Sequence, residues 1–358
     1  MIEKVIIFIH GRPSPHPLHK SFGESVGANF ILVDRILRWH DKESFAIKRY
    51  LSWLLNALFL PKRNKAHVFI TEGPHFVAGV LKWLNLIGKK QITIALLDNE
   101  TLYFIDKNIY STRTKNALIK LIKSYDAIIS PGNMEFELAK KYSGSNAIVK
   151  KIFNGINDQR LENLLKIKPE FDNTNIVFIG NVGADWRAYY KGVDMMLQSF
   201  EIAFKTNNQL KLFIIGDWDK HHFVETIEKH APLSKKAITK VGYTKEIDAY
   251  LTNASLYLHT ARGESWGISV TEAMAAGIMP IVSVDTGSKE VVEKVDSSYV
   301  VSLSKESIAG KIIEHFNESK SKLNHYSLRC KEVASYYSET NAINAFKNAF
   351  SEIVSELS

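Results

Sequence analysis

Two glutamates are the strongest candidates in this sequence for a binding or catalytic site. Glu264 and Glu272 lie eight residues apart in the run R-G-E-S-W-G-I-S-V-T-E-A-M-A-A-G, residues 262–277. Apolar residues at 254–260 and 279–284 predict a buried strand on each side, which places the run on a strand-to-helix turn. Backbone N–H groups at a helix N-terminus bind phosphate, and carboxylates bind sugar hydroxyls. The run therefore predicts a site for a phosphate beside a polyol, as in a nucleotide sugar.

A small-residue turn after the second of these strands completes a recognisable pattern; it contains Thr286, Gly287, Ser288 and Glu290. With the two glutamates, the aromatic-Gly step and the E-A-M-A-A-G helix, it resembles the signature of the retaining GT-B glycosyltransferases of family 4 (glycosyl transferases group 1). The resemblance implies that Glu264 contacts the donor sugar and that Glu272 holds the ribose hydroxyls. It also implies that sugar and phosphate meet the backbone of Ser265, Trp266, Gly267, Ile268 and Ser269.

The same family carries two basic side chains near the donor diphosphate. In the stretch from 178 to 192, Lys191 followed by Gly192 matches one of them. The other, an arginine that usually follows Gly180, is replaced here by Asn181, and we consider Arg187 as its substitute. The simpler interpretation is that Lys191 and Arg187 are solvated residues at the start of a helix.

Three other places are candidates for the site because each follows a predicted strand. Tyr243, after 238–241, lies where the family places the nucleotide base, although a simple turn explains it equally well. Asp98, after 91–97, is a candidate for the sugar or acceptor hydroxyl. The acceptor-side candidates follow the first strand and are His10, Gly11 and Arg12. The turn at 154–157, N-G-I-N, resembles a family turn but has no assigned catalytic role.

Metal binding has little support in the sequence. The run Asp217-Trp218-Asp219 spells the Asp-x-Asp with which another glycosyltransferase fold binds a metal, but it follows the wrong strand. The adjacent His221 and His222 lack helical ligand spacing. We therefore expect no metal and no cofactor, with a UDP- or GDP-sugar as the substrate.

The elements around these residues predict two α/β domains. The first half has strands at 4–9, 30–34, 67–71, 91–97 and 126–130; the second has strands at 175–180, 210–216, 238–241, 254–258, 279–284 and 299–301, with helices between them. A polar stretch at 161–175 containing Pro169 predicts a linker. We expect domains at 1–165, which binds the acceptor, and 166–335, which binds the nucleotide sugar. The resemblance implies the GT-B fold, with two Rossmann-like doubly wound domains facing across a cleft. The amphipathic segment 336–358 would be the helix that crosses back to the first domain.

The two halves of the sequence differ in net charge. Residues 1–160 carry 24 Lys and Arg against 13 Asp and Glu, an excess of 11 positive charges, whereas residues 161–358 carry 22 against 25. The basic residues gather in a stretch at 35–65 and a predicted helix at 107–125, which indicates an anionic partner. An anionic membrane surface with a lipid-linked saccharide acceptor is our hypothesis, and a solvated helix edge is the alternative for 45–60. No nucleic-acid-binding motif accompanies the charge.

The sequence also indicates the cellular compartment of the protein and its class of function. The sequence has a single cysteine, Cys330, and shows neither a signal peptide nor a segment long enough to span a bilayer. A cytoplasmic protein is expected, with peripheral binding to the inner face of the membrane as a further hypothesis. The predicted function is that of a retaining, metal-independent hexosyltransferase. The alternatives are a nucleotide-sugar epimerase of GT-B fold and a non-catalytic scaffold that binds nucleotide sugar or membrane.

Overall fold

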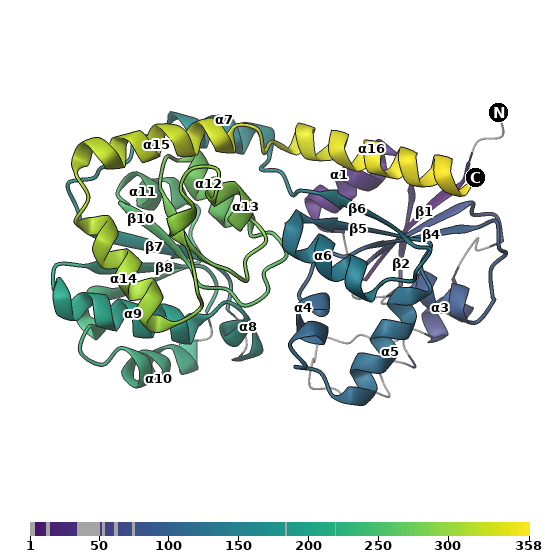
Figure 1. Cartoon of the computed structure of the whole chain (residues 1–358), viewed down its shortest axis with the longest axis horizontal. Coiled ribbons are helices and arrows are strands. Elements are labelled where there is room, and N and C mark those ends of the chain that lie inside the picture. Colours follow the sequence, from purple (N-terminus) through teal and green to yellow (C-terminus); the bar gives the residue numbers. More distant parts are fainter. Residues whose placement is uncertain are drawn as a thin grey trace. The chain divides into compact units, whose positions relative to one another are not determined.

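The computed structural model describes residues 4–11, 15–33, 51, 54–60, 64–73, 76–182, 185–218 and 220–358. The chain forms two compact units. The first comprises Met1–Gly155 together with Glu339–Ser358, and the second comprises Ile156–Ser338. Each unit has its own parallel six-stranded sheet with helices on its faces (Figure 1).

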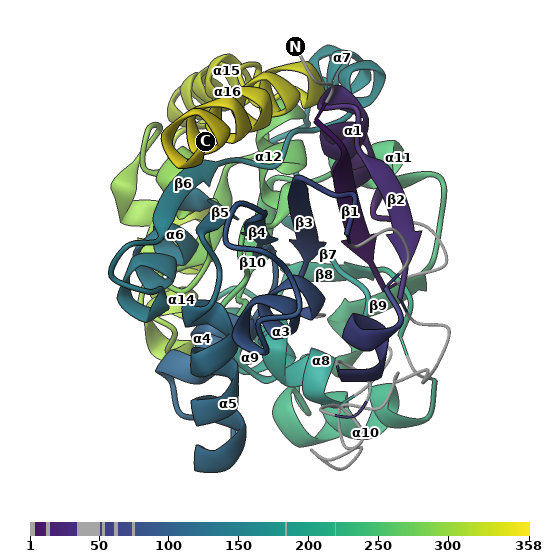
Figure 2. The same cartoon turned by 90° about the vertical axis from the view of Figure 1, so that its right-hand side faces the viewer.

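The first unit is built from β1 (Ile6–His10), α1 (Pro17–Ser25), β2 (Asn29–Leu32), β3 (Val68–Glu72), α3 (Val77–Trp83), β4 (Ile92–Leu96), α4 (Thr101–Asp106), α5 (Thr112–Lys123), β5 (Ala127–Pro131), α6 (Gly132–Tyr142), β6 (Ile148–Ile152) and α16 (Glu339–Leu357). Its strand order is β2-β1-β3-β4-β5-β6, which Figure 2 shows fanned across the sheet. The four central strands, β1, β3, β4 and β5, are buried runs rich in apolar and β-branched residues, as is typical of parallel sheets covered on both faces.

Alternate strand residues of this sheet belong to two separate cores. Phe8 and Ile70 face α1 and α16, whereas Ile7 and Phe69 face the helices α3 to α6. The C-terminal helix α16 therefore closes one core of the first unit, although it follows the whole second unit in sequence. The ring of Phe346 on α16 stacks on Phe22 of α1 with 4.7 Å between centroids.

The second unit is built from α7 (Asp158–Lys166), β7 (Asn175–Ile179), α8 (Asp185–Tyr190), α9 (Val193–Thr206), β8 (Lys211–Ile215), α10 (Lys220–His230), the 3-10 turn η1 (Lys235–Ala237), β9 (Ile238–Gly242), α11 (Ile247–Thr252), β10 (Leu256–His259), α12 (Ile268–Ala275), β11 (Pro280–Ser283), α13 (Lys289–Val292), the 3-10 turn η2 (Ser297–Tyr299), β12 (Val300–Val301), α14 (Lys305–Phe316) and α15 (Lys320–Ala334). Its strand order is β12-β11-β10-β7-β8-β9, again all parallel.

The domain division differs from the predicted boundaries at 165 and 336. The predicted linker at 161–175 begins inside α7, where Leu161 and Leu164 are buried. Asn157 caps this helix by accepting a hydrogen bond from the Arg160 backbone N–H at 3.3 Å. The division therefore lies at 155/156, because residues 158–166 have an apolar face that packs into the second unit.

Two predicted elements of the first half also need correction. Strand β6 was missed, because its sequence I-V-K-K-I carries two lysines at the sheet edge, where charged residues are tolerated. The predicted basic helix at 107–125 begins only at Thr112, where Ser111 caps it by accepting from the Thr114 N–H. Most of the basic stretch 35–65 lies outside the described residues.

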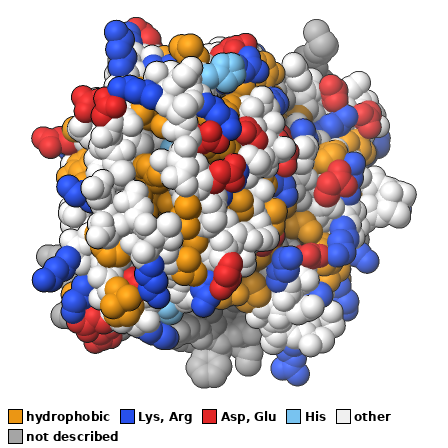
Figure 3. All heavy atoms as spheres, turned by 60° about the vertical axis from the view of Figure 1, so that its left-hand side comes forward, with side chains coloured by type: hydrophobic (Ala, Val, Ile, Leu, Met, Phe, Trp, Pro, Cys, Tyr) orange, Lys and Arg blue, Asp and Glu red, His pale blue; other side chains and the backbone are white. Residues whose placement is uncertain are grey.

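Within the part of the chain that the structure describes, no helix is both long enough and apolar enough to cross a bilayer. On the face shown in Figure 3, acidic and basic side chains are interspersed.

Candidate active site

The strand order of the second unit determines where its site lies. Its first strand, β7, pairs directly with its fourth, β10, and the chain continues from these two strands toward opposite edges of the sheet. In open α/β sheets, ligands bind at the carboxyl ends of the strands at such a switch point. The loops that leave β7 and β10 are 180–192 and 260–267, which contain the predicted residues Lys191 and Glu264. The topology thus brings the two halves of the predicted site together.

Lys191 and Glu264 form an ion pair between these loops, from Lys191 Nζ to Glu264 Oε2. The pair is mostly enclosed, since the two side chains are 12% and 15% exposed. The Lys191 ammonium also lies 5.4 Å from the centre of the Tyr190 ring. A cation and a carboxylate in a poorly solvated place interact strongly with a charged ligand. This arrangement suits an anionic diphosphate beside a sugar.

His259, the last residue of β10, lies behind Glu264 and was not anticipated from the sequence. Its ring is fully buried, and its Nε2 is 3.8 Å from Glu264 Oε2. Burial lowers the pKa of His259 to about 4, so the ring is neutral at physiological pH. Neither ring nitrogen has a hydrogen-bond partner among the described residues. The wall behind Glu264 is therefore uncharged.

Glycines allow the loops to approach each other closely. Gly192 has a φ of +66°, and a Cβ there would lie 1.7 Å from the carbonyl oxygen of Thr260. Gly287 accommodates the Ser265 carbonyl in the same way, and its N–H donates to the Glu264 carbonyl at 2.7 Å. Gly267, with a φ of +85°, begins α12. The K-G and T-G-S patterns therefore mark backbone contacts that exclude a side chain.

The predicted ribose residue Glu272 lies on α12 and is held by a residue that the sequence analysis missed. Arg160 of α7 donates from Nε to Glu272 Oε1 at 3.4 Å and pairs through Nη1 with Asp248 of α11. Burial raises the pKa of Glu272, and the Arg160 charge opposes this effect. No local spacing could have revealed the pair, because 112 positions separate Arg160 from Glu272.

The remaining residues of the motif mainly support the turn. Trp266 is fully buried, with its ring centre 5.6 Å from that of Tyr337. Ser265 is buried, and Ile268 and Ser269 open α12; the Ser269 hydroxyl accepts from Tyr257 at 2.8 Å. Since Trp266 is enclosed, only the backbone of this residue is available to a ligand.

Arg262 fixes the beginning of the motif on α9. Its guanidinium donates to both carboxylate oxygens of Asp194, at 2.7 and 2.8 Å, and to the Tyr189 carbonyl at 2.7 Å. Bidentate pairs of this kind are strong and directional. The Asp194–Arg262 pair therefore holds the helix after Lys191 against the loop of Glu264.

Asn181, which replaces the expected arginine, connects two loops. Its side-chain oxygen accepts from the Asp217 N–H at 2.8 Å, and its carbonyl accepts from Arg187 Nε at 3.1 Å. The Gly180 carbonyl accepts from the indole of Trp218 at 3.1 Å. The middle residue of the Asp-x-Asp run thus packs structurally, and Asp219 lies outside the described residues.

Tyr243 follows β9 at the edge of the sheet, and 77% of its surface is exposed. Among the described residues, no group of three or more His, Cys, Asp or Glu side chains is arranged to hold a metal.

In the first unit, Asp98 belongs to a buried polar cluster at the carboxyl ends of the strands. Its Oδ2 lies 3.0 Å from His19 Nε2 and accepts from Asn154 Nδ2 at 2.7 Å. His19 Nδ1 lies 2.6 Å from Glu72 Oε1. The sequence analysis missed His19 and Glu72. Glu72 is the last residue of β3, whereas His19 lies within α1 and has no sequence signal of this kind.

The acceptor-side candidates follow β1 in the same unit. His10 is its last residue and is buried, with its ring 6.2 Å from that of Phe30, and Gly11 is buried beside it. Arg12 lies outside the described residues.

A comparison with protein families finds a match in the second unit. Residues 166–329 match the family model described as glycosyl transferases group 1. An uncharacterised 41.2 kDa protein in the cps region of Klebsiella pneumoniae is 24% identical over 289 residues, which cover 76% of this chain and 74% of that protein.

Solved structures match nearly the whole chain. Sucrose-phosphate synthase from Thermosynechococcus elongatus aligns with a TM-score of 0.76 at 12% identity, covering 99% of this chain and 100% of that one. Anabaena Alr3699/HepE in complex with UDP and glucose aligns with a TM-score of 0.69 at 12% identity, covering 98% and 100%. At these identities the likeness establishes the fold, while the family match lies in the unit that carries Lys191 and Glu264. The chain therefore has the GT-B fold, and its residues 166–329 are similar to the glycosyl transferases group 1 family.

Proposed function

We propose that this protein is a glycosyltransferase that moves a hexose from a nucleotide diphosphate to a saccharide or lipid-linked saccharide, with retention of configuration and without a bound metal. The observation that carries the proposal is the enclosed Lys191–Glu264 ion pair at the switch point of the second unit. A fixed cation beside a carboxylate matches the two parts of a nucleotide sugar, its diphosphate and its hydroxylated ring.

Each residue of the site has a proposed role. Lys191 stabilises the diphosphate, which gains negative charge as the glycosidic bond breaks. Glu264 accepts hydrogen bonds from the donor sugar, and Glu272 accepts them from the ribose hydroxyls. Backbone N–H groups at the start of α12 contribute at the phosphate. Gly180, Asn181, Arg187 and Tyr243 are proposed to line the donor site.

The proposed reaction uses the leaving group as its base. The acceptor hydroxyl attacks the anomeric carbon on the face from which the diphosphate departs. Its proton passes to a phosphate oxygen, so one C–O bond forms as another breaks. We propose that Asp98 orients the sugar or acceptor hydroxyl, and that His10, Gly11 and Arg12 contribute on the acceptor side.

Glu264→Ala tests the assignment after a donor has been identified. A thermal-shift panel of UDP- and GDP-sugars identifies the donor, because a ligand stabilises the state that binds it. We expect Glu264→Ala to keep its melting temperature without donor and to lose about 100-fold or more in kcat, the size of effect seen when one transition-state partner is removed. Glu246→Ala, on an exposed loop of the same unit, is the matched control. Unchanged turnover in Glu264→Ala would rule out the proposed role.

The same assay separates the alternatives. An epimerase would convert the donor sugar without an acceptor, whereas a scaffold would bind the donor and release no nucleoside diphosphate. Product analysis by NMR of the anomeric proton also tests retention, since the α or β coupling of product and donor must agree.

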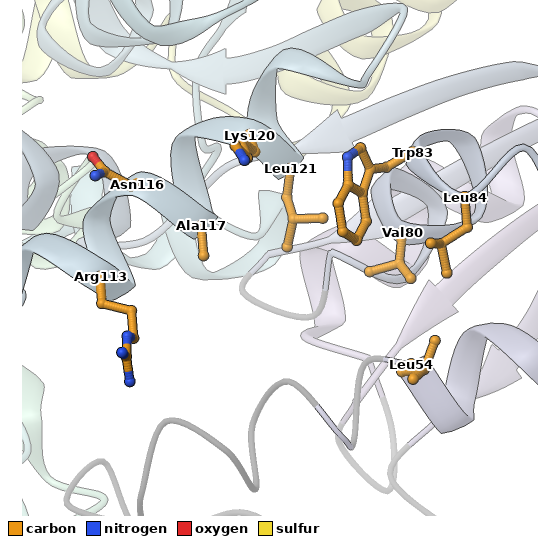
Figure 4. Close-up of a pocket in the computed structure, with 9 residues that line it drawn as sticks. All are labelled: Leu54, Val80, Trp83, Leu84, Arg113, Asn116, Ala117, Lys120 and Leu121. Carbon is orange, nitrogen blue, oxygen red and sulfur yellow. The ribbon is translucent and has the colours of Figure 1, made fainter.

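The partner of the first unit is proposed to be an anionic membrane surface. Helix α5 carries Arg113, Lys115, Lys120 and Lys123 and no Asp or Glu. Between α3 and α5 lies a cavity of about 580 Å³, lined mainly by apolar side chains, with Arg113 and Lys120 on its α5 side and the half-exposed Trp83 on α3 (Figure 4). Cations beside an apolar hollow with an exposed tryptophan suit a lipid–water interface.

Liposome sedimentation tests this partner. We expect binding to vesicles with anionic phospholipid at low salt, and loss of most of it in Arg113→Glu/Lys120→Glu. The control, Lys205→Glu/Lys236→Glu, makes the same charge change at exposed sites of the second unit. Equal loss in both variants would show that only net charge matters and would reject an α5 docking face.

A further inference from the structure

A histidine in the first unit lies between two carboxylates at the carboxyl edge of the sheet. His19, on α1, has Nδ1 2.6 Å from Glu72 Oε1 and Nε2 3.0 Å from Asp98 Oδ2. The side chains of His19, Glu72 and Asp98 are 6%, 7% and 12% exposed. We propose that His19 is a positioning residue, an imidazolium that fixes the Asp98 carboxylate for glycosyl transfer. The inference rests on the proposed function, because it takes Asp98 as the group that meets a reacting hydroxyl.

The geometry requires two donors on one ring. A neutral imidazole has a single N–H, so its other nitrogen would direct a lone pair at a carboxylate oxygen. An imidazolium donates from both nitrogens and forms two charge-assisted hydrogen bonds. Burial by itself lowers the pKa of His19, but the hydrogen bonds and charges of Asp98 and Glu72 outweigh it and raise the pKa to about 9.

A second donor completes the orientation of Asp98. Asn154 Nδ2 donates to the same Oδ2 atom at 2.7 Å. The two donors come from α1 and from the loop after β6, whereas Asp98 follows β4. A carboxylate held through one oxygen from two directions has its plane and rotamer fixed. Such a group is preorganised, which is the property that a hydroxyl-orienting residue needs.

Other titratable groups make the charge on His19 necessary. Glu135 of α6 is fully buried near Asp98 and Glu100; burial first, and then these two charges, raise its pKa well above the usual value. The protonated form of Glu135 is therefore favoured. His16 caps α1 with its ring 5.2 Å from that of His19. Without the His19 cation, this acidic surrounding would favour protonation of Asp98 as well.

The position of His19 shows that it acts as a positioning residue and not as a catalytic one. It is enclosed between Glu72 and Asp98, and its ring stacks on Phe22 at 6.1 Å, toward the core of the unit. A substitution should therefore act through the orientation and ionisation of Asp98 rather than through substrate contact. The expected signature is a loss in kcat and a changed pH profile, with donor affinity retained.

The first measurement is independent of activity. Histidine-selective ¹⁵N labelling of the full chain reports whether both ring nitrogens of His19 carry protons. We expect imidazolium shifts at pH 7.5, with titration near pH 9 in the wild type and at least one pH unit lower in Glu72→Gln. A His19 signal with one protonated and one bare nitrogen at pH 7.5 would overturn the proposal.

The second measurement uses turnover. We expect His19→Gln to lower kcat at least 10-fold with donor KM within twofold. Glu72→Gln should lose activity at a lower pH than the wild type, because His19 then releases its proton earlier. The control His325→Gln changes an exposed histidine of α15 and should match the wild type. Wild-type kcat and pH profile in Glu72→Gln, with His19 titrating earlier, would show that the pair has no positioning role.

The two proposals can fail separately. If the wild type transferred no sugar from any donor but His19 were an imidazolium, the proposed function would fail and the charge arrangement would remain. If transfer required Glu264 but His19 were neutral, only the present inference would fail. If His19→Gln does not fold, the Glu72→Gln variant and the NMR titration still test the proposed role of His19.

Discussion

At the scale of residues, the candidate site of the second unit places a mostly enclosed charge pair beside a buried histidine. Lys191 and Glu264 carry opposite charges, while His259 directly behind them is neutral because burial lowers its pKa to about 4. In the other unit, His19 has the opposite behaviour because two carboxylates surround it. The same residue type is thus uncharged beside Glu264 in the second unit and charged beside Asp98 in the first.

Replacement of Lys191 should act on the diphosphate. We expect Lys191→Ala to lower kcat/KM by about 100- to 1000-fold, since a preorganised charge partner of the leaving group is removed. Lys205→Ala, at an exposed position of α9, is the control. Steady-state kinetics on the identified donor would check this, and a decrease below threefold would argue against a role for Lys191 at the phosphate.

The titration of His19 should appear in the pH dependence of stability. Folding raises its pKa from 6.5 to about 9, so the folded state binds the proton more tightly than the unfolded chain. The contribution of this proton to the stability of the folded state is complete below pH 6.5, declines as the pH rises, and is lost above about pH 9. Urea unfolding of wild type and His19→Gln should be measured at pH 6, 7.5 and 9.5. The difference between their free energies of unfolding should become smaller as the pH rises. A difference that grew with pH would contradict the assignment of the charge.

At the scale of elements, the loops after β7 and β10 are held together because their backbones are in contact. Gly192 begins α9 in the left-handed region and lies against Thr260, whose hydroxyl donates to the Gly192 carbonyl at 2.9 Å. The Arg262–Asp194 pair links the same two segments. The position of Lys191 thus depends on contacts made by its neighbours in sequence.

Gly192→Ala should be more damaging than backbone strain alone explains. Its Cβ would lie 1.7 Å from the Thr260 carbonyl oxygen, so the loops must separate. Gly242→Ala is the matched control in the same unit, because Gly242 has a φ of +79° with nothing within 4 Å of its Cβ position. We expect about 1–2 kcal/mol of destabilisation for Gly242→Ala and clearly more for Gly192→Ala, measured by urea unfolding. Equal losses would show that the loops can move apart freely.

At the scale of the whole molecule, the first unit is assembled from both ends of the sequence. Helix α16 contributes Ala342, Phe346, Ala349, Phe350 and Ile353 to a core formed with β1, β3, β4 and β5. The proposed donor residues Lys191, Glu264 and Glu272 lie in the second unit, between residues 156 and 338. Damage to α16 should therefore separate stability of the first unit from donor binding in the second.

Phe346→Ala tests this separation. Loss of a fully buried ring stacked on Phe22 should cost about 3–5 kcal/mol. Lys347→Ala, at the next and exposed position of the helix, should change stability by less than about 0.5 kcal/mol. Hydrogen exchange should show faster exchange in β1 and β3 only for Phe346→Ala, while the affinity for the nucleotide sugar stays the same. A parallel loss of donor affinity would show that the units do not behave separately.

Within the described part of the chain, the sequence by itself determined the α/β class, eleven of the twelve strands and the residues of the proposed donor motif. These features are local: alternation, glycine positions and the spacing of Glu264 and Glu272 are all set within one strand, turn or helix. The missed strand β6 contains two lysines, and the misplaced linker begins in the amphipathic helix α7. Packing within the tertiary structure fixes the positions of both segments.

Tertiary structure alone decided which chemical groups meet. Lys191 and Glu264 are 73 positions apart and become neighbours because β7 pairs with β10. His19, Glu72, Asp98 and Asn154 come from four segments that share only the carboxyl edge of one sheet. Local patterns record which face of an element is buried but not the order in which strands pair, and it is the strand order that brings distant charges within a few ångströms of each other.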